Sequence, residues 1–176
     1  DRYLFFDRAV RAMLDANGRY ADFRPDVIIA NDWQAGFLPL FFRYGTFRRP
    51  IATVLTIHNA TYGFQMSFPI ERFEAATGLL GSEHPWLYSA DGIEFHRKVD
   101  ALKAGIVMAD RVVTVSPQYA QELLDETTPE PFKYGGILRA HRRKFSGALN
   151  GLPADFNPKK AFNDEIIPFS FHSEDL

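Results

Sequence analysis

Residues 51–57 read Ile-Ala-Thr-Val-Leu-Thr-Ile, and a polar pair follows them directly. The run is apolar nearly throughout and rich in β-branched residues, which predicts a strand buried on both faces. Residues 26–30 (DVIIA) and 111–115 (RVVTV) are runs of the same kind, and 145–149 (FSGAL) is a weaker one. Strands of this type separated by helices predict an α/β fold with a doubly wound parallel sheet, covered by helices on both faces.

Helical periodicity fills the intervals between these runs. We expect helices over residues 1–16, 33–43, 92–108 and 136–143, with a short one after Pro69. In the third of these, apolar residues at 95, 99, 102 and 106 lie on one stripe. Ser116 and Pro117 predict a further helix start, because serine caps the first turn and proline fits inside it.

The composition indicates a globular domain and excludes several classes of protein. Of the 176 residues, 46% are hydrophobic, 24% are charged and 17 are phenylalanine, which favours a dense core over disorder. A net charge of −2 provides no general attraction to nucleic acid or to an anionic membrane. The absence of cysteine rules out disulfides and thiolate metal sites.

A short segment with at least one polar residue follows each predicted strand. The segments are Asn31, Asp32 and Trp33 after the first, His58 and Asn59 after the second, Ser116 and Pro117 after the third, and Asn150 and Gly151 after the fourth. Ligands of parallel α/β sheets bind at the carboxyl ends of the strands. Carboxylate and amide groups hydrogen-bond vicinal hydroxyls, and an indole face packs on the C–H face of a sugar ring. This edge therefore predicts a polyhydroxylated ligand.

Each of these residues also has a simpler interpretation. Asp32 could act only as a helix N-cap, Trp33 could belong to the core, and a lone His58 is more often structural than catalytic. Asn150 and Gly151 form a common turn dipeptide. Phosphate-loop, dinucleotide-binding, HExxH, Asp-x-Asp and serine-hydrolase motifs do not occur in the sequence. The basic run at 139–144 (RAHRRK) could meet a phosphate or a partner, although a solvated helix face explains it as well.

The ordered set of motifs resembles the bacterial glycogen synthase and plant starch synthase family. The matching stretches are 31–33 (NDW), 56–59 (TIHN) with Tyr62 and Gly63, 92–110, 114–120, 136–138 (GIL) and 149–151 (LNG). The resemblance covers residues 1–158 and implies the Rossmann-like N-terminal half of a two-domain, metal-independent glycosyltransferase of the GT-B fold. Such enzymes transfer glucose from ADP-glucose, or UDP-glucose in some members, to the non-reducing end of an α-1,4-glucan with retention.

The resemblance also implies roles for individual residues. His58 and Asp32 fall at catalytic-site positions, where the histidine orients the transferred glucose and stabilises an oxocarbenium-like transition state. Trp33, Asn59 and Tyr62 fall at substrate-binding positions, and so do Asn150 and Gly151 near the crossover to the second domain. No metal and no cofactor are implied. The expected partners are the nucleotide sugar and the glucan acceptor, with no nucleic acid and no membrane.

Several features depart from the family pattern. The Lys-x-Gly-Gly loop and the C-terminal donor domain are absent from this chain, so the isolated chain is expected to be inactive. An aliphatic residue and then aspartate usually follow Asn-Gly, whereas here Leu152 is followed by Pro153. Asp100 stands where asparagine is expected, and His96 where glycine or a small residue is expected. We expect residues 159–176 to form a poorly ordered tail or the start of the crossover.

Two other functions stay open from the sequence. One is a non-catalytic glucan-binding paralogue. The other is a receiver-like signalling domain, with Asp32 as phosphoacceptor and Lys103 as its lysine, although the acidic pair that holds Mg²⁺ in such domains is missing. The expected location is the cytoplasm of a bacterium, or the plastid stroma if the source is a plant.

Overall fold

The computed structural model describes residues 2–15, 17, 20, 22–60, 67–127 and 134–151. The elements are α1 (Arg2–Leu14), β1 (Val27–Asn31), η1 (Trp33–Ala35), α2 (Leu38–Arg43), β2 (Ala52–Ile57), β3 (Ser67–Phe68), α3 (Ile70–Thr77), β4 (Glu94–Phe95), β5 (Lys98–Asp100), α4 (Ala101–Met108), β6 (Arg111–Thr114), α5 (Pro117–Leu124), α6 (Gly135–Ala140), η2 (Arg142–Lys144) and β7 (Phe145–Gly147). Tyr62 and the tail expected at 159–176 lie outside the described residues.

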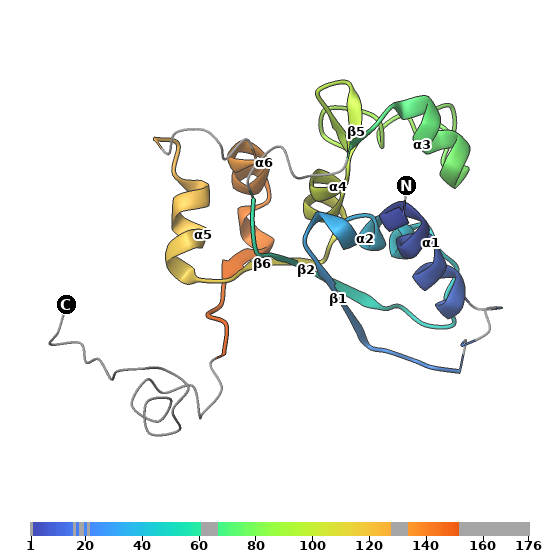
Figure 1. The fold of residues 1–176 in the computed structure, drawn as a ribbon, viewed down its shortest axis with the longest axis horizontal. Helices are drawn as coiled ribbons and strands as arrows, with labels where there is room; N and C mark the ends of the chain where they lie inside the picture. The colour runs from blue at the N-terminus through green and yellow to red at the C-terminus, as the bar shows by residue number, and fades with distance from the viewer. Residues whose placement is uncertain are drawn as a thin grey trace, which may run out of the picture.

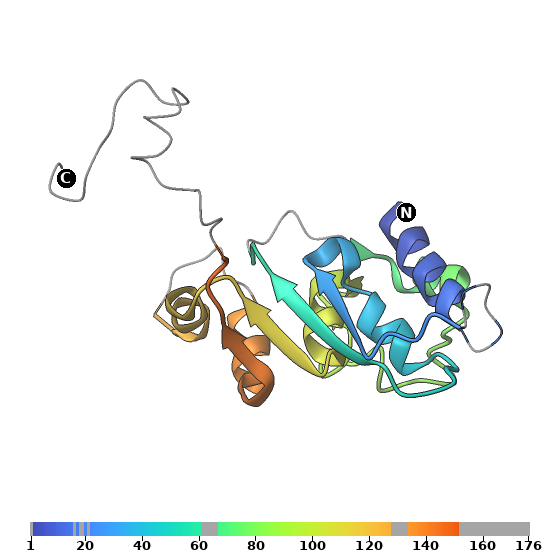
Figure 2. The same cartoon turned by 90° about the horizontal axis from the view of Figure 1, so that it is seen from below.

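The main sheet contains the four predicted strands in the order β1-β2-β6-β7, and all its neighbouring pairs are parallel. Figure 2 shows the four arrows side by side and pointing the same way. Each strand begins and ends within two residues of the predicted range, because the apolar runs that define them are short and bounded by polar residues. The predicted α/β fold with a parallel sheet is confirmed.

Helices cover one face of this sheet in the described part of the chain, whereas coverage of both faces was expected. Each new strand is added on the same side of the previous one, so right-handed crossovers put every connecting helix on the same face. Figure 1 shows α1, α2, α4 and α6 on one side of the sheet. Burial agrees, since Leu55 and Val112 are 0% exposed while Ile29, which points to the other face, is 63% exposed.

The long helix expected over 92–108 is wrong in its first half. Residues 94–100 form the hairpin β4–β5, which pairs with β3 in a second, antiparallel sheet, and only α4 is helical. The side chain of Asp100 starts this helix by accepting a hydrogen bond from the backbone N–H of Lys103 at 2.8 Å. The apolar residues Phe95 and Val99 are four apart, which imitates helical spacing although they lie on paired strands.

Helix α4 is the centre of the core, and all eight of its residues are buried. It lies close to η1: a Cβ on Gly36 would be 2.2 Å from the carbonyl oxygen of Ala101. The helix expected over 33–43 is accordingly divided into η1 and α2. The predicted cap of α5 is confirmed, because the Ser116 hydroxyl accepts from the N–H of Tyr119 at 2.9 Å with Pro117 in the first turn.

Candidate active site at the carboxyl edge of the sheet

The polar residues after β1 and β2 lie next to one another. The two strands are paired with Asn31 opposite Thr56, so the residues that follow each strand leave the sheet at the same edge. The backbone N–H of Asp32 donates to the carbonyl of Thr56 at 2.8 Å, which extends the strand pairing past the end of β1. The register of this pair therefore fixes which side chains meet.

Asp32 reaches across from β1 to the turn after β2. Its carboxylate oxygen Oδ1 accepts hydrogen bonds from the backbone N–H of His58 at 2.7 Å and of Asn59 at 3.3 Å. It makes no capping bond to η1, so the simple N-cap interpretation does not apply. Asp32 has φ 53° and ψ −170°, a backbone conformation that residues with a side chain rarely adopt and that often marks a functional site.

The imidazole of His58 is also held. Its Nε2 lies 3.1 Å from the side-chain oxygen Oδ1 of Asn31, and because that oxygen only accepts, the contact selects the tautomer with hydrogen on Nε2. The side chain of His58 is exposed at the edge of the sheet. Asn31 belongs to the motif at 31–33 (NDW), but no role in the site was predicted for it. The available indication was its position at the end of a strand, next to the strand that His58 follows.

Two residues on neighbouring elements support the turn after β2, and the sequence did not indicate either role. The hydroxyl of Tyr119, on α5, accepts from the N–H of Ala60 at 3.1 Å. The hydroxyl of Thr114, at the end of β6, donates to the carbonyl of Ile57 at 2.8 Å. The backbone on both sides of His58 is thus fixed from neighbouring elements.

Trp33 is half-buried at the start of η1. Its ring contacts that of Tyr3, on α1, edge to face, with 5.1 Å between centroids and 80° between planes. It also packs against both clusters of the hydrophobic core. The ring therefore has a packing role, and the acceptor-binding role expected for it stays a prediction.

The other expected substrate-binding residues have different positions. Asn59 is exposed in the turn after β2, next to His58. Asn150 and Gly151 are exposed and follow β7, which lies two strands from β2, about 10 Å away by the spacing of strands. The contacts that join Asp32 to the turn after β2 do not extend to them.

Lys103 does not have the surroundings that a receiver-like site requires. The residue is buried in α4, and its Nζ donates to the carbonyl oxygens of Ala90 and Glu94. Burial lowers the pKa of this lysine. Its hydrogen bonds join α4 to the segment around the hairpin, which is a structural task.

Neither a metal cluster nor a membrane span is found in the described ranges. No group of three or more His, Asp or Glu residues there could hold a metal ion. No helix among those residues is long and apolar enough to cross a membrane.

The parallel sheet and its polar carboxyl edge define an α/β domain of the kind that binds ligands where the strands end. Comparison with known proteins gives the family. The family described as "Starch synthase catalytic domain" matches residues 1–141. The chain is 40% identical over 162 residues to "Glycogen synthase 2" of Bradyrhizobium diazoefficiens, covering 91% of this chain and 31% of that protein.

Further relatives agree with this match. "Glycogen synthase" of Opitutus terrae is 38% identical over 183 residues, covering 100% of this chain and 34% of that protein. Among solved structures, the catalytic domain of starch synthase IV from Arabidopsis thaliana, bound to ADP and acarbose, matches with a TM-score of 0.68 and 26% identity, over 99% of this chain and 34% of that one. The chain belongs to the starch synthase catalytic domain family, and it spans about a third of the length of these relatives.

Proposed function

We propose that this chain is the acceptor-side domain of a retaining glycosyltransferase. The complete enzyme would transfer glucose from ADP-glucose, or from UDP-glucose, to the non-reducing end of an α-1,4-glucan during glycogen or starch synthesis. Membership of the family and the glycogen synthases among the relatives support this function. The receiver-like alternative loses its basis, because neither the family nor the surroundings of Lys103 fit it.

The observation that carries the proposal is the contact of Asp32 with the turn that bears His58. A carboxylate that holds two successive N–H groups fixes the backbone, while Asn31 fixes the imidazole, so the ring is positioned before any substrate arrives. Preorganised polar groups stabilise a transition state most when they need no rearrangement during the reaction. In this proposal His58 orients the transferred glucose and Asp32 positions His58.

The proposed ligands follow from the family and from the chemistry of the edge. The Arabidopsis relative was solved with ADP and acarbose, which supports a nucleotide sugar and a glucan as the two substrates. Asn59, Asn150 and Gly151 would contribute hydrogen-bonding groups along the edge, and Trp33 would offer a ring to the acceptor. Tyr62 is proposed for the same surface on the family motif alone. No cofactor is required.

The test is a transfer assay on a full-length parent that contains this chain. Radiolabelled ADP-glucose and UDP-glucose are supplied with a maltooligosaccharide acceptor, and the anomeric configuration of the product is read by proton NMR. We expect elongation with an α-1,4 linkage by the parent and none by the 176-residue chain alone. Glucan binding by the parent without turnover of either donor would instead support the non-catalytic paralogue.

We also propose a cytoplasmic location in a bacterium, because the glycogen synthases that the chain resembles come from bacteria. Fluorescence microscopy of a tagged parent in a bacterial host that makes glycogen would test it. A signal confined to the membrane or the periplasm would contradict this location.

A further inference from the structure

A cavity lies at the opposite edge of the sheet from His58. It has a volume of about 540 Å³ and is formed where β6 and β7 begin, between the ends of α2, α4 and α6 and the turn η2. Because the strands are parallel, this amino edge is separated from the carboxyl edge by the length of a strand, on the order of 15 Å. The cavity is thus distinct from the candidate active site.

The lining of this cavity is strongly basic. Six cationic side chains border it: Arg43, Arg111, Arg139, Arg142, Arg143 and Lys144. Of the described residues that line the cavity, Asp110 alone carries a carboxylate, and its Oδ2 already accepts from the backbone N–H and the hydroxyl of Thr53 at 2.7 and 3.0 Å. The concentration of positive charge contrasts with the net charge of −2 for the whole chain.

Some of these cations have structural tasks at the end of α4. The Nζ of Lys144 donates to the carbonyls of Val107 and Ala109 at 2.8 and 2.7 Å, and Arg43 donates to the carbonyl of Met108 at 3.2 Å. These are carbonyls that a helix end leaves without partners in the helix, and cations there also complement the helix dipole. Lys144 and Arg43 are therefore explained by the fold.

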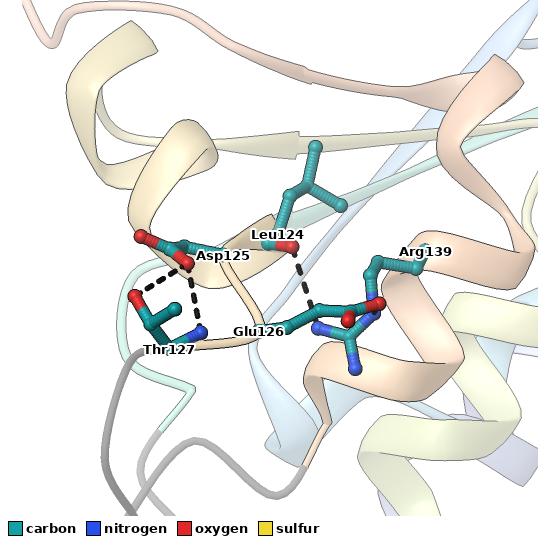
Figure 3. A network of polar contacts seen from close by, with 5 residues as sticks. All are labelled: Leu124, Asp125, Glu126, Thr127 and Arg139. Atoms are coloured by element: carbon teal, nitrogen blue, oxygen red, sulfur yellow. Dashed lines mark hydrogen bonds and ion pairs between the residues drawn. The ribbon is translucent and has the colours of Figure 1, made fainter.

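Arg139 has partners of its own at the end of α5. Figure 3 shows its guanidinium directed at the carbonyl of Leu124, 3.3 Å away, and at the carboxylate of Glu126, 3.4 Å away. The neighbouring loop is closed by Asp125, whose carboxylate accepts from the N–H and the hydroxyl of Thr127 at 2.8 Å each. This arrangement fixes one wall of the cavity.

Arg142 and Arg143 are different. Both are exposed on η2, and within the part of the chain that the structure describes their guanidinium groups have no hydrogen bond or ion pair. Burial and, after it, the nearby Arg43 lower the pKa of Lys144 to about 8. The pKa of His141, which also lines the cavity, is lowered by burial and then by Lys144. The fold thus gathers positive charge here that the acidic residues described by the structure do not neutralise.

We propose that this cavity is a second ligand site that binds a small phosphate-bearing anion, with Arg142 and Arg143 as its principal contacts. The planar guanidinium presents paired donors that match phosphate oxygens, which makes arginine suited to this recognition. The volume falls within the range of small-molecule sites. The acidic balance of the chain as a whole does not favour a nucleic acid.

The test is a titration of the 176-residue chain, labelled with nitrogen-15, with pyrophosphate at constant ionic strength near 0.15 M, where weak surface attraction is screened. The site variant is Arg142→Gln with Arg143→Gln. The matched control is Arg8→Gln with Arg24→Gln, which removes the same charge from exposed arginines. These lie on α1 and before β1, and β1 is the outer strand on the opposite side of the sheet from β7. Thermal melting of both variants checks that the fold is retained.

We expect saturable binding by the unsubstituted 176-residue chain, which is the parent of both variants, and by the control. The affinity of the site variant should be lower by at least about tenfold. Bound anion should also raise the pKa of His141, read from its ring signals, in the parent and the control and not in the site variant. Equal losses in the two variants, or no saturation in the parent, would overturn the proposal. Tighter binding of a polyglutamate peptide than of pyrophosphate would also overturn it, because that result indicates an acidic protein partner.

Discussion

The carboxylate of Asp32, at the end of β1, holds the backbone N–H of His58, at the end of β2, at 2.7 Å. The same oxygen accepts from the N–H of Asn59 at 3.3 Å, and Asn31 contacts the imidazole at 3.1 Å. Asn31 and Asp32, where β1 ends, thus determine where the side chain of His58 lies after β2. At this edge of the sheet, His58 exposes its side chain, and Asp32 and Asn31 hold it in position.

Asp32→Ala in a full-length parent should lower kcat by about ten- to a hundredfold. The substitution leaves two N–H groups without their acceptor and lets the turn that carries His58 move, and a small misplacement of a reacting group is costly. Asp32→Asn keeps an acceptor oxygen and should retain more activity than Asp32→Ala. The measurement is kcat beside thermal melting for both variants; equal activity of Asp32→Ala and the parent would show that the turn needs no such support.

Trp33→Ala should raise the KM for the oligosaccharide acceptor more than the KM for the nucleotide sugar. Loss of one stacking contact costs on the order of 1 kcal/mol or more, close to tenfold in affinity. Tyr3→Ala is the matched control, since it removes the edge-to-face contact with Trp33 but leaves the indole in place. An unchanged acceptor KM in a folded Trp33→Ala variant would leave this residue with its packing role only.

Asp7→Asn should change how stability depends on pH. Asp7 is 0% exposed, its Oδ2 accepts from the N–H of Phe37 at 3.1 Å, and its buried Oδ1 has no hydrogen-bond partner among the described residues. Burial raises its pKa from 3.8 to about 8. The folded state therefore binds a proton that the unfolded state releases between these values, so this group's contribution is fully present below pH 3.8 and is lost as pH rises to about 8.

The Asn variant lacks this titration and keeps an acceptor for Phe37. Its free energy of unfolding, measured in urea, should exceed that of the same protein with Asp7 at about pH 8, and the difference should shrink toward pH 4. Asp22→Asn, which changes an exposed carboxylate, should not alter the slope. Parallel pH curves for parent and Asp7→Asn would show that Asp7 stays ionised when folded.

Arg97→Gly should raise the free energy of unfolding by up to about 1 kcal/mol. The two-residue turn between β4 and β5 has φ 52° at His96 and 64° at Arg97, and such turns favour Asn-Gly because a side chain is strained at positive φ. Lys98→Gly, within β5, is the control and should destabilise; equal effects of the two glycines would contradict the turn argument.

The sheet was predictable because its strands are short apolar runs between polar residues. The coverage of only one face was not predictable, since Val27 and Ile29 are exposed although apolar strand residues of this kind are usually buried. Their exposure depends on the order of the strands in the sheet, β1-β2-β6-β7. The hairpin over 94–100 was missed because an apolar spacing of four is shared by a helix and by this paired segment. A helix cap at Asp100 was the available signal for the true start of α4.

The site was predictable in its location and only partly in its contacts. The rule that ligands bind at strand ends placed Asp32 and His58 on one edge, and the structure brings them into contact. The positive φ of Asp32 and the contact of Asn31 with the imidazole depend on the register of β1 with β2, which a sequence does not state. The role of Tyr119 depends on the packing of α5 and was likewise hidden.

His58→Ala in a full-length parent, with kcat and thermal melting measured side by side, is the most direct test of a catalytic role for His58. Burial at the end of β2 comes from Leu55 and Ile57, both 0% exposed, so loss of the exposed imidazole should cost less than about 1.5 kcal/mol of stability. We expect a nearly normal melting temperature and a kcat lower by about 10²–10³-fold, the scale for removing one preorganised polar group. A large drop in melting temperature with intact turnover would contradict a catalytic role and make His58 a structural residue.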